Sequence, residues 1–312
     1  MSVLICGSMA YDNIMVFRGR FRDHILPDQI HILNVAFLVP EMRQELGGCA
    51  GNIAYNLRLL GGEPLIMATV GRDFDRYRAR LAAQGLEQRY ITAIPEALTA
   101  QAYITTDLDA NQITAFHPGA MEHSHLNRVP AAAGIAIGVV SPDGRQGMVD
   151  HAAQFAAAGI PWMFDPGQGL PMFDGDELRR FIDQAAWVTV NDYEGRLLTE
   201  RSGWSEAEIA SRVRALVITR GGEGSTIFAA GRRIDIPPVA PTRIADPTGC
   251  GDAYRAGLLH GISRNLPWEE TGRLASLIGA LKIAQQGTQN HRFTPASLAA
   301  DYRAAFGQAI AL

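Results

Sequence analysis

The chain has 312 residues, of which 47% are hydrophobic and 19% charged; this is enough for a full hydrophobic core and excludes a disordered protein. The formal net charge of −4 gives no overall basic field, so neither a nucleic acid nor a membrane surface is expected as a partner. Lys282 is the only lysine, so a mechanism that depends on a lysine amine has a single candidate.

The first residues predict a buried strand and no export segment. Residues 3–6 form a short apolar run that Gly7 closes, and no basic region precedes it. No apolar run approaches the roughly 18 residues that a membrane helix needs. Cys6, Cys49 and Cys250 are far apart and form no Cys-x-x-Cys pair. We therefore expect a cytoplasmic protein in a reducing compartment.

Residues 12–46 mix hydrophobic residues with charges and prolines, which indicates exposed or half-exposed strands. The alternation in residues 28–39 suggests an edge that could pair between subunits, so a homodimer is a hypothesis. Residues 103–106 and 113–116 have the pattern of a hairpin around residues 109–111.

From residue 47 onward the pattern is that of an α/β protein. It predicts a helix over 52–60, a strand over 65–70, a helix over 73–84, a second hairpin over 226–236 and mostly helix from 252 onward. Between them lie short apolar runs separated by helical stretches, at residues 134–140, 162–164, 187–190 and 215–219. Buried strands that alternate with helices predict a mainly parallel sheet covered on both faces, in one domain with a small β insertion.

The strongest chemical pattern is the segment Asp246-Pro-Thr-Gly-Cys-Gly-Asp252. Gly249 and Gly251 let backbone N–H groups converge at the start of a helix, which creates an anion site. A carboxylate in the first turn, such as Asp252, suits a base that accepts the proton of an alcohol during phosphoryl transfer. The alternative is a tight turn before an ordinary helix carboxylate. Arg255 could reach a phosphate or form a surface salt bridge.

Three further motifs each have a structural alternative. Residues 47–52 open a helix, where Asn52 either binds ligand hydroxyl groups or caps the helix. Asn191 and Glu194 follow a strand, where they fit water-mediated Mg²⁺ or phosphate contacts, or form a capping box. The glycines of residues 219–225 let the backbone approach a nucleotide or make a hairpin turn.

Together these motifs resemble the ribokinase/PfkB family of carbohydrate kinases, and the resemblance covers nearly the whole chain. The helix start at residues 47–52 resembles the family's first signature, and Asn191-x-x-Glu194 resembles its Asn-x-x-Glu motif. Residues 246–257 resemble the second signature, which is highly specific. The resemblance implies a ribokinase-like three-layer α/β/α fold with a mainly parallel central sheet. It also implies one kinase domain over residues 1–312 with a β lid from about 12–46 and 100–121.

The resemblance also implies a role for individual residues. These are Asp252 as general base; the backbone of Gly249, Cys250 and Gly251 as anion hole; Asp12, Gly48 and Asn52 for the hydroxyl groups of the acceptor; Asn191, Glu194, Thr219, Gly221 and Gly224 for ATP, with Glu194 organising Mg²⁺ through water; and Asp246 and Thr248 for a monovalent cation, which some members bind.

Two residues depart from the family's pattern. Cys250 replaces the usual Ala, which is harmless if only its N–H group is used. Pro247 replaces the usual Thr, which leaves the need for K⁺ open.

Two classes of acceptor fit the resemblance: the 5′-hydroxyl of adenosine or another purine nucleoside, and a primary alcohol of a free sugar. Aromatic residues in the lid favour the nucleoside, because stacking contributes about 1–3 kcal/mol per base. Phe37 and Phe116 are the candidates, and residues 24–48 resemble the adenosine/nucleoside kinase branch. Alternatively, these aromatic residues pack the lid or a dimer interface. A binding protein without catalysis has no need for the base Asp252.

Overall fold

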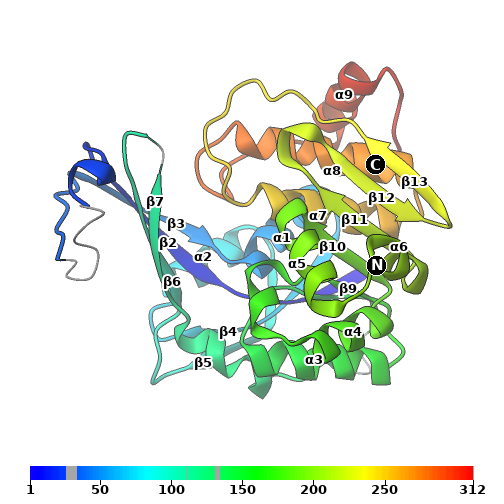
Figure 1. Cartoon of the computed structure of the whole chain (residues 1–312), viewed down its shortest axis with the longest axis horizontal. Coiled ribbons are helices and arrows are strands. Elements are labelled where there is room, and N and C mark those ends of the chain that lie inside the picture. Colours follow the sequence, from blue (N-terminus) through cyan, green and yellow to red (C-terminus); the bar gives the residue numbers. More distant parts are fainter. Residues whose placement is uncertain (26–33, 110, 131–133, 312) are drawn as a thin grey trace.

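A nine-stranded sheet forms the centre of the molecule (Figure 1). The computed structural model describes residues 1–25, 34–109, 111–130 and 134–311. All strand pairs are parallel except β11–β12 and β12–β13 at one edge. Across the sheet the strands follow the order β13 (Arg232–Ile236), β12 (Ser225–Ala229), β11 (Ala215–Thr219), β10 (Trp187–Asn191), β9 (Trp162–Phe164), β8 (Ile135–Val140), β1 (Ser2–Cys6), β4 (Glu63–Gly71) and β5 (Glu87–Ile94).

Alternating side chains of the strands pack into two separate hydrophobic clusters, one on each face of the sheet. Ile5 and Ile66 belong to one cluster, and their neighbours Leu4 and Leu65 belong to the other. The first face is covered by α1 (Cys49–Leu59), α2 (Asp75–Ala83), α7 (Cys250–Ser263) and α8 (Trp268–Ile283), and the second by α3 (Arg145–Ala157), α4 (Gly175–Gln184), α5 (Asp192–Ser202) and α6 (Glu206–Arg212). The last helix, α9 (Pro295–Phe306), packs on α8.

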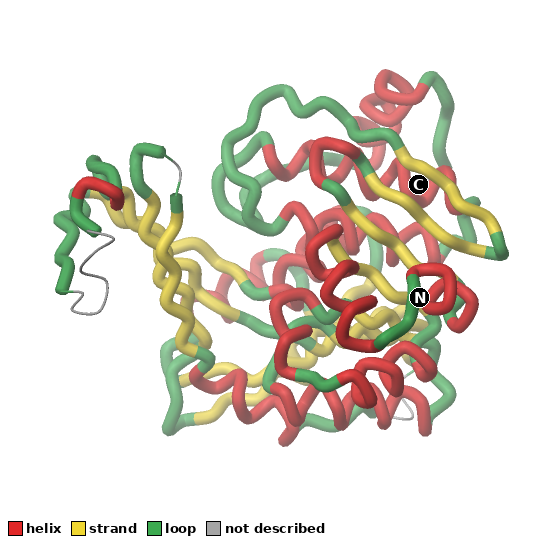
Figure 2. The backbone as a smooth tube through the Cα atoms, viewed as in Figure 1, coloured by secondary structure: helices red, strands yellow, loops and turns green. Residues whose placement is uncertain are grey.

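A second, four-stranded sheet stands apart from the body of the molecule (Figure 2). Its strands follow the order β3 (Glu41–Gly47), β2 (Ala10–Val16), β6 (Ala100–Thr106) and β7 (Gln112–His117). The predicted fold class, a three-layer α/β/α fold with a mainly parallel central sheet and a small separate sheet, is therefore confirmed.

The structure corrects some of the predicted element boundaries. Helix α1 begins at Cys49 and not at Asn52, because the carbonyl and hydroxyl oxygens of Ser8 accept the N–H groups of Ala50 and Cys49. Residues 34–39 form no strand, and the rest of the alternating segment, residues 28–33, lies outside the described residues. Within the described ranges, no helix has the length and apolar character to span a membrane.

Candidate active site

Polar residues stand in a row at the carboxyl ends of the central strands. Ser141 follows β8, Asp165 follows β9, and Asn191 and Thr219 end β10 and β11. The carboxyl edge of a parallel sheet is where ligands of open α/β folds bind. Helix α7 reaches this edge, since Arg255 in its second turn forms an ion pair with Asp165. The candidate site therefore lies between this edge and the start of α7.

Asp252 lies in the first turn of α7 and is held by a chain of side chains from distant segments. The amide nitrogen of Asn52 donates to Oδ2 of Asp252 at 2.8 Å. The amide of Gln289 donates to the other end of the Asn52 amide at 3.0 Å, and also to the hydroxyl of Tyr77 at 2.6 Å. Asn52 is therefore not the N-cap of α1, since Gly48 holds that position. The side-chain amide of Asn52 instead orients the carboxylate of Asp252.

The surroundings of Asp252 leave its carboxylate more basic than usual. Burial raises the pKa of Asp252 to about 6, although the guanidinium of Arg255 and the amide of Asn52 lower it. A carboxyl group with this pKa is ionised at neutral pH and accepts a proton more readily than an ordinary aspartate.

The loop before Asp252 presents backbone N–H groups. Gly249 is the N-cap of α7 and has φ of 79°, a left-handed conformation that favours glycine. The N–H group of Cys250 donates to the carbonyl of Pro247 at 3.2 Å. Within the part of the chain that the structure describes, the N–H groups of Gly249 and Gly251 have no protein acceptor. These two groups and the positive end of the helix dipole favour an anion.

Arg255 forms a buried ion pair, which differs from the surface salt bridge that was one of its two alternatives. Its side chain is 8% exposed, and its Nε lies 2.5 Å from Oδ1 of Asp165. A second guanidinium nitrogen lies 3.8 Å from the carboxylate of Glu194. The hydroxyl of Ser141 donates to the other oxygen of Asp165 at 2.9 Å. Arg255 thus joins α7 to the ends of β9 and β10.

Sequence reasoning missed Asp165 and Ser141. Each follows a buried apolar strand, as Asn191 does, and applying the same rule for strand ends to β8 and β9 could have found them.

In both motifs that are expected to contact the nucleotide, the structure shows the structural alternative, a capping box in one and a turn between two strands in the other. Asn191 and Glu194 form a reciprocal capping box, with hydrogen bonds of 2.7 and 2.8 Å. Thr219, Gly221 and Gly224 lie at the turn between β11 and the antiparallel strand β12. Contact of these residues with a nucleotide stays a prediction.

The small sheet brings Asp12 toward Asp252. Burial and the carboxylates of Asp252, Asp246 and Glu45 raise the pKa of Asp12 to about 6.

Gly48 joins β3 to α1 and has φ of 87°. A Cβ at this position would lie 2.5 Å from the carbonyl oxygen of Ser8, so glycine is required.

The two candidate aromatic residues have different surroundings. Asp12 pairs with Ala102 and Ala102 with Phe116, so Phe116 lies on the same face of the small sheet as Asp12, and half of it is exposed. Phe37 instead packs on Phe17, with ring centres 4.8 Å apart. Phe17 is five residues along the chain from Asp12, about 16 Å in a strand. The structure therefore brings Phe116, but not Phe37, to the face that carries Asp12.

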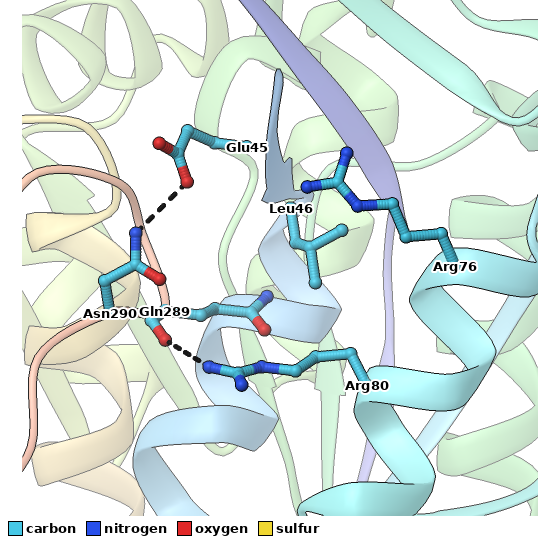
Figure 3. Close-up of a pocket in the computed structure, with 6 residues that line it drawn as sticks. All are labelled: Glu45, Leu46, Arg76, Arg80, Gln289 and Asn290. Atoms are coloured by element: carbon cyan, nitrogen blue, oxygen red, sulfur yellow. Dashed lines mark hydrogen bonds between the residues drawn. The ribbon is translucent and has the colours of Figure 1, made fainter. Parts of the chain in front are cut away.

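A cavity of about 330 Å³ lies beside this region (Figure 3). Its lining comes from the end of β3, from α2 and from the loop after α8, namely Glu45, Leu46, Arg76, Arg80, Gln289 and Asn290. Gln289 links the cavity to Asn52.

The residues expected to bind a monovalent cation are already committed to protein groups. The carboxylate of Asp246 accepts the N–H groups of Thr248 at 2.9 Å and Gly287 at 3.0 Å. The carbonyl oxygen of Asp246 accepts from the ammonium of Lys282 at 2.6 Å. A diffusible K⁺ ion does not fit this set, because an ammonium group already lies at the oxygen that would ligate it.

Solved structures and curated sequences resemble the chain over nearly its full length. The nucleoside kinase of Burkholderia thailandensis in complex with inosine is 55% identical, with a TM-score of 0.91, and the match covers 98% of this chain and 99% of that protein. Its complex described as ADP-inosine has a TM-score of 0.89 at 57% identity, over 98% of this chain and 97% of that one. A nucleoside kinase of Methanocaldococcus jannaschii is 28% identical over 83% of this chain and 85% of its own length.

The family model described as pfkB family carbohydrate kinase matches residues 10–295. This range includes the small sheet, the loop of residues 246–251 (the anion loop) and Asp252. The chain therefore belongs to the pfkB family of carbohydrate kinases.

Proposed function

We propose that this protein is an ATP-dependent nucleoside kinase that transfers the γ-phosphate to the 5′-hydroxyl of a purine nucleoside. The observation that carries the proposal is the carboxylate of Asp252, which Asn52 orients at 2.8 Å beside the N–H groups of the anion loop. The 55% identical kinase of Burkholderia thailandensis was solved with inosine, a purine nucleoside, which supports this class of acceptor.

In the proposed reaction, the carboxylate of Asp252 takes the proton of the 5′-hydroxyl as that oxygen attacks the γ-phosphorus. The new phosphorus–oxygen bond replaces the bond to the bridging oxygen, and ADP leaves with the electron pair of that bond. The N–H groups of Gly249 and Gly251 stabilise the charge on the transferred group. Asp252 then returns its proton to solvent.

Mg²⁺ fits the site as an ion held mainly by phosphate oxygens and water. The side chain of Glu194 is 13% exposed and lies beside the sheet edge, as indirect coordination requires. Among the described residues no cluster of three or more His, Cys, Asp or Glu residues forms a cage for a metal ion. When bound, the ion neutralises phosphate charge.

Thr219, Gly221 and Gly224 are proposed to contact ATP.

The acceptor is proposed to bind between the small sheet and α1. Asp12 and Asn52 bind ribose hydroxyl groups, and the backbone of Gly48 leaves room for the sugar. Phe116 stacks on the base, because it is a half-exposed aromatic residue on the face that carries Asp12. The small sheet then acts as a lid over the nucleoside.

A panel of acceptors tests the proposed substrate class. With Mg-ATP, we expect ADP release with inosine or adenosine, and kcat/KM values for ribose and fructose at least about fivefold lower. The reason is the lost base stacking, about 1–3 kcal/mol or about 5- to 150-fold. Turnover with a free sugar alone would reject the nucleoside, and no turnover with any acceptor would reject the kinase.

A matched pair of variants tests the role of Phe116. Phe116→Ala is expected to raise KM for inosine about tenfold and to leave the low activity toward ribose unchanged. Tyr103→Ala is the control: Tyr103 is also exposed, but it pairs with Asn13 and so lies on the opposite face of the small sheet. Equal effects of the two substitutions would argue against stacking on Phe116.

The pKa of Asp252 predicts the acid limb of the pH profile. The base must be ionised, so kcat/KM should fall as pH decreases through about 6, tenfold per pH unit. Asp12, with a pKa also raised to about 6, would steepen the limb if its ionised form binds the acceptor. The measurement is ADP release from pH 5 to 8, with circular dichroism to verify the fold. A limb centred near pH 4 would show an unperturbed base.

A further inference from the structure

The only lysine of the chain is completely buried behind the anion loop. Lys282 lies in the last turn of α8 with an exposed fraction of 0%. Its ammonium donates to the carbonyl oxygen of Asp246 at 2.6 Å and lies 3.5 Å from that of Gln285. A buried lysine is rare unless a specific partner holds it. Here the partner is Asp246, the first residue of the segment that ends in Asp252.

The ammonium of Lys282 lies among acidic side chains. Burial lowers the pKa of Lys282, and the carboxylates of Asp246, Asp252 and Glu45 oppose this shift by favouring its charged form. Across the loop, Arg43 lies 3.8 Å from the carboxylate of Asp246 at a half-exposed position, whereas Lys282 is fully enclosed. Lys282 is thus a fully buried positive charge at the start of this loop, whereas Arg255 lies at its other end, beside Gly251.

Lys282 contacts two backbone carbonyl oxygens, the type of ligand that a bound monovalent cation uses. Such a cation replaces its hydration shell with carbonyl oxygens of the backbone. An ammonium group carries one positive charge and uses the same carbonyl oxygens through its N–H donors. It differs from a free ion in being covalently attached, so its binding does not depend on salt.

We propose that the ammonium of Lys282 is a built-in substitute for a monovalent cation, which positions the anion loop so that catalysis does not depend on K⁺. The proposal rests on the proposed function, since the loop it positions serves phosphoryl transfer. Lys282 is a positioning residue: it acts through the carbonyl of Asp246, and the turn that follows places the N–H groups of Gly249 and Gly251.

The geometry explains how one contact controls the loop. Asp246 is held by Lys282 through its carbonyl and by Thr248 and Gly287 through its carboxylate. The thiol of Cys250 also points to this carbonyl, at 3.9 Å. Without the ammonium, the buried carbonyl loses its charged donor, and the loop between Asp246 and Asp252 loses its fixed starting point.

The first experiment uses the unmodified protein in different salts. ADP release at saturating Mg-ATP and inosine is measured in KCl, NaCl, CsCl and choline chloride at constant ionic strength. We expect rates within twofold of one another, and melting temperatures that do not distinguish KCl from NaCl. Activation of fivefold or more by K⁺ over choline would overturn the proposal while leaving the kinase intact. Absence of activity in every salt would reject the proposed function instead.

The second experiment removes the ammonium. Lys282→Met is expected to lower kcat at least 20-fold in choline chloride with little change in KM for inosine, and NH₄⁺ or K⁺ is expected to restore part of the rate. Arg243→Met is the matched control. Arg243 lies three residues before Asp246 and donates to the carbonyl of Ala284 at 2.7 Å, but it does not contact Asp246. This control should keep kcat within twofold in every salt.

Circular dichroism and thermal melting separate a folding defect from the proposed role. If Lys282→Met does not fold, the salt panel on the unmodified protein decides alone. If it folds and keeps full kcat in choline chloride, or if its lost activity is insensitive to every added cation and to Lys282→Arg, Lys282 has only a structural role.

Discussion

Replacing Asp252 with Asn is expected to lower kcat by about 10²- to 10⁴-fold while inosine still binds. The amide has the same shape as the carboxyl group and can still accept from Asn52, but it cannot take the proton of the 5′-hydroxyl. ADP release gives kcat, and isothermal titration with inosine gives the dissociation constant. A merely structural carboxylate would lose binding and folding stability together with the rate.

The matched control for this substitution is Asp192→Asn. Asp192 is also an acidic residue in the first turn of a helix at the carboxyl edge of the sheet, but it is exposed. Its substitution should change kcat less than twofold. If Asp252→Asn kept more than a tenth of the wild-type kcat, Asp252 could not be the general base.

The second large effect is expected for Arg255→Met, which should destabilise the fold by about 3–5 kcal/mol. The substitution leaves the buried carboxylate of Asp165 and the partly buried one of Glu194 without their cation, and removing one partner of a buried ion pair carries this cost. Urea unfolding followed by tryptophan fluorescence measures it, provided that the unfolding slope is unchanged.

Two further variants determine whether the lost charge is the cause of the lower stability of Arg255→Met. Adding Asp165→Asn to Arg255→Met should recover part of the lost stability, because one unpaired carboxylate is removed. Arg233→Met breaks an ion pair with Asp235 in which both side chains are more than half exposed, and should leave the stability nearly unchanged. An Arg255→Met protein as stable as the wild type would exclude a structural role for this pair.

The local patterns of the sequence predict the fold class, although they miss the edge strand β5. Alternating buried strands and helices predict a sheet covered on both faces, and the two hairpins were located correctly at residues 103–116 and 226–236. Each of these features depends on neighbours in the chain, on the period of hydrophobic residues and on glycine turns. Boundaries were less accurate, as at α1, where Ser8 from a distant segment starts the helix early.

The candidate site was only partly predictable for the same reason. Glycine turns and the motif around Asp252 pointed to the anion loop, because a turn and the helix after it are local. The partners of Asp252 are not local: Asn52 lies 200 residues away along the chain, and Gln289 follows another helix. No pattern in one sequence specifies such pairs.

The sequence by itself therefore determined the fold class, the anion loop and its acidic residue, since these depend on periodicity and on short motifs. Only the tertiary structure decided which charges are paired. It buried Arg255 against Asp165, placed the ammonium of Lys282 on the carbonyl of Asp246, and separated Phe116 from Phe37. The physical reason is that burial and pairing depend on which distant segments the sheet brings together, and hydrophobic periodicity fixes only the face on which a residue lies.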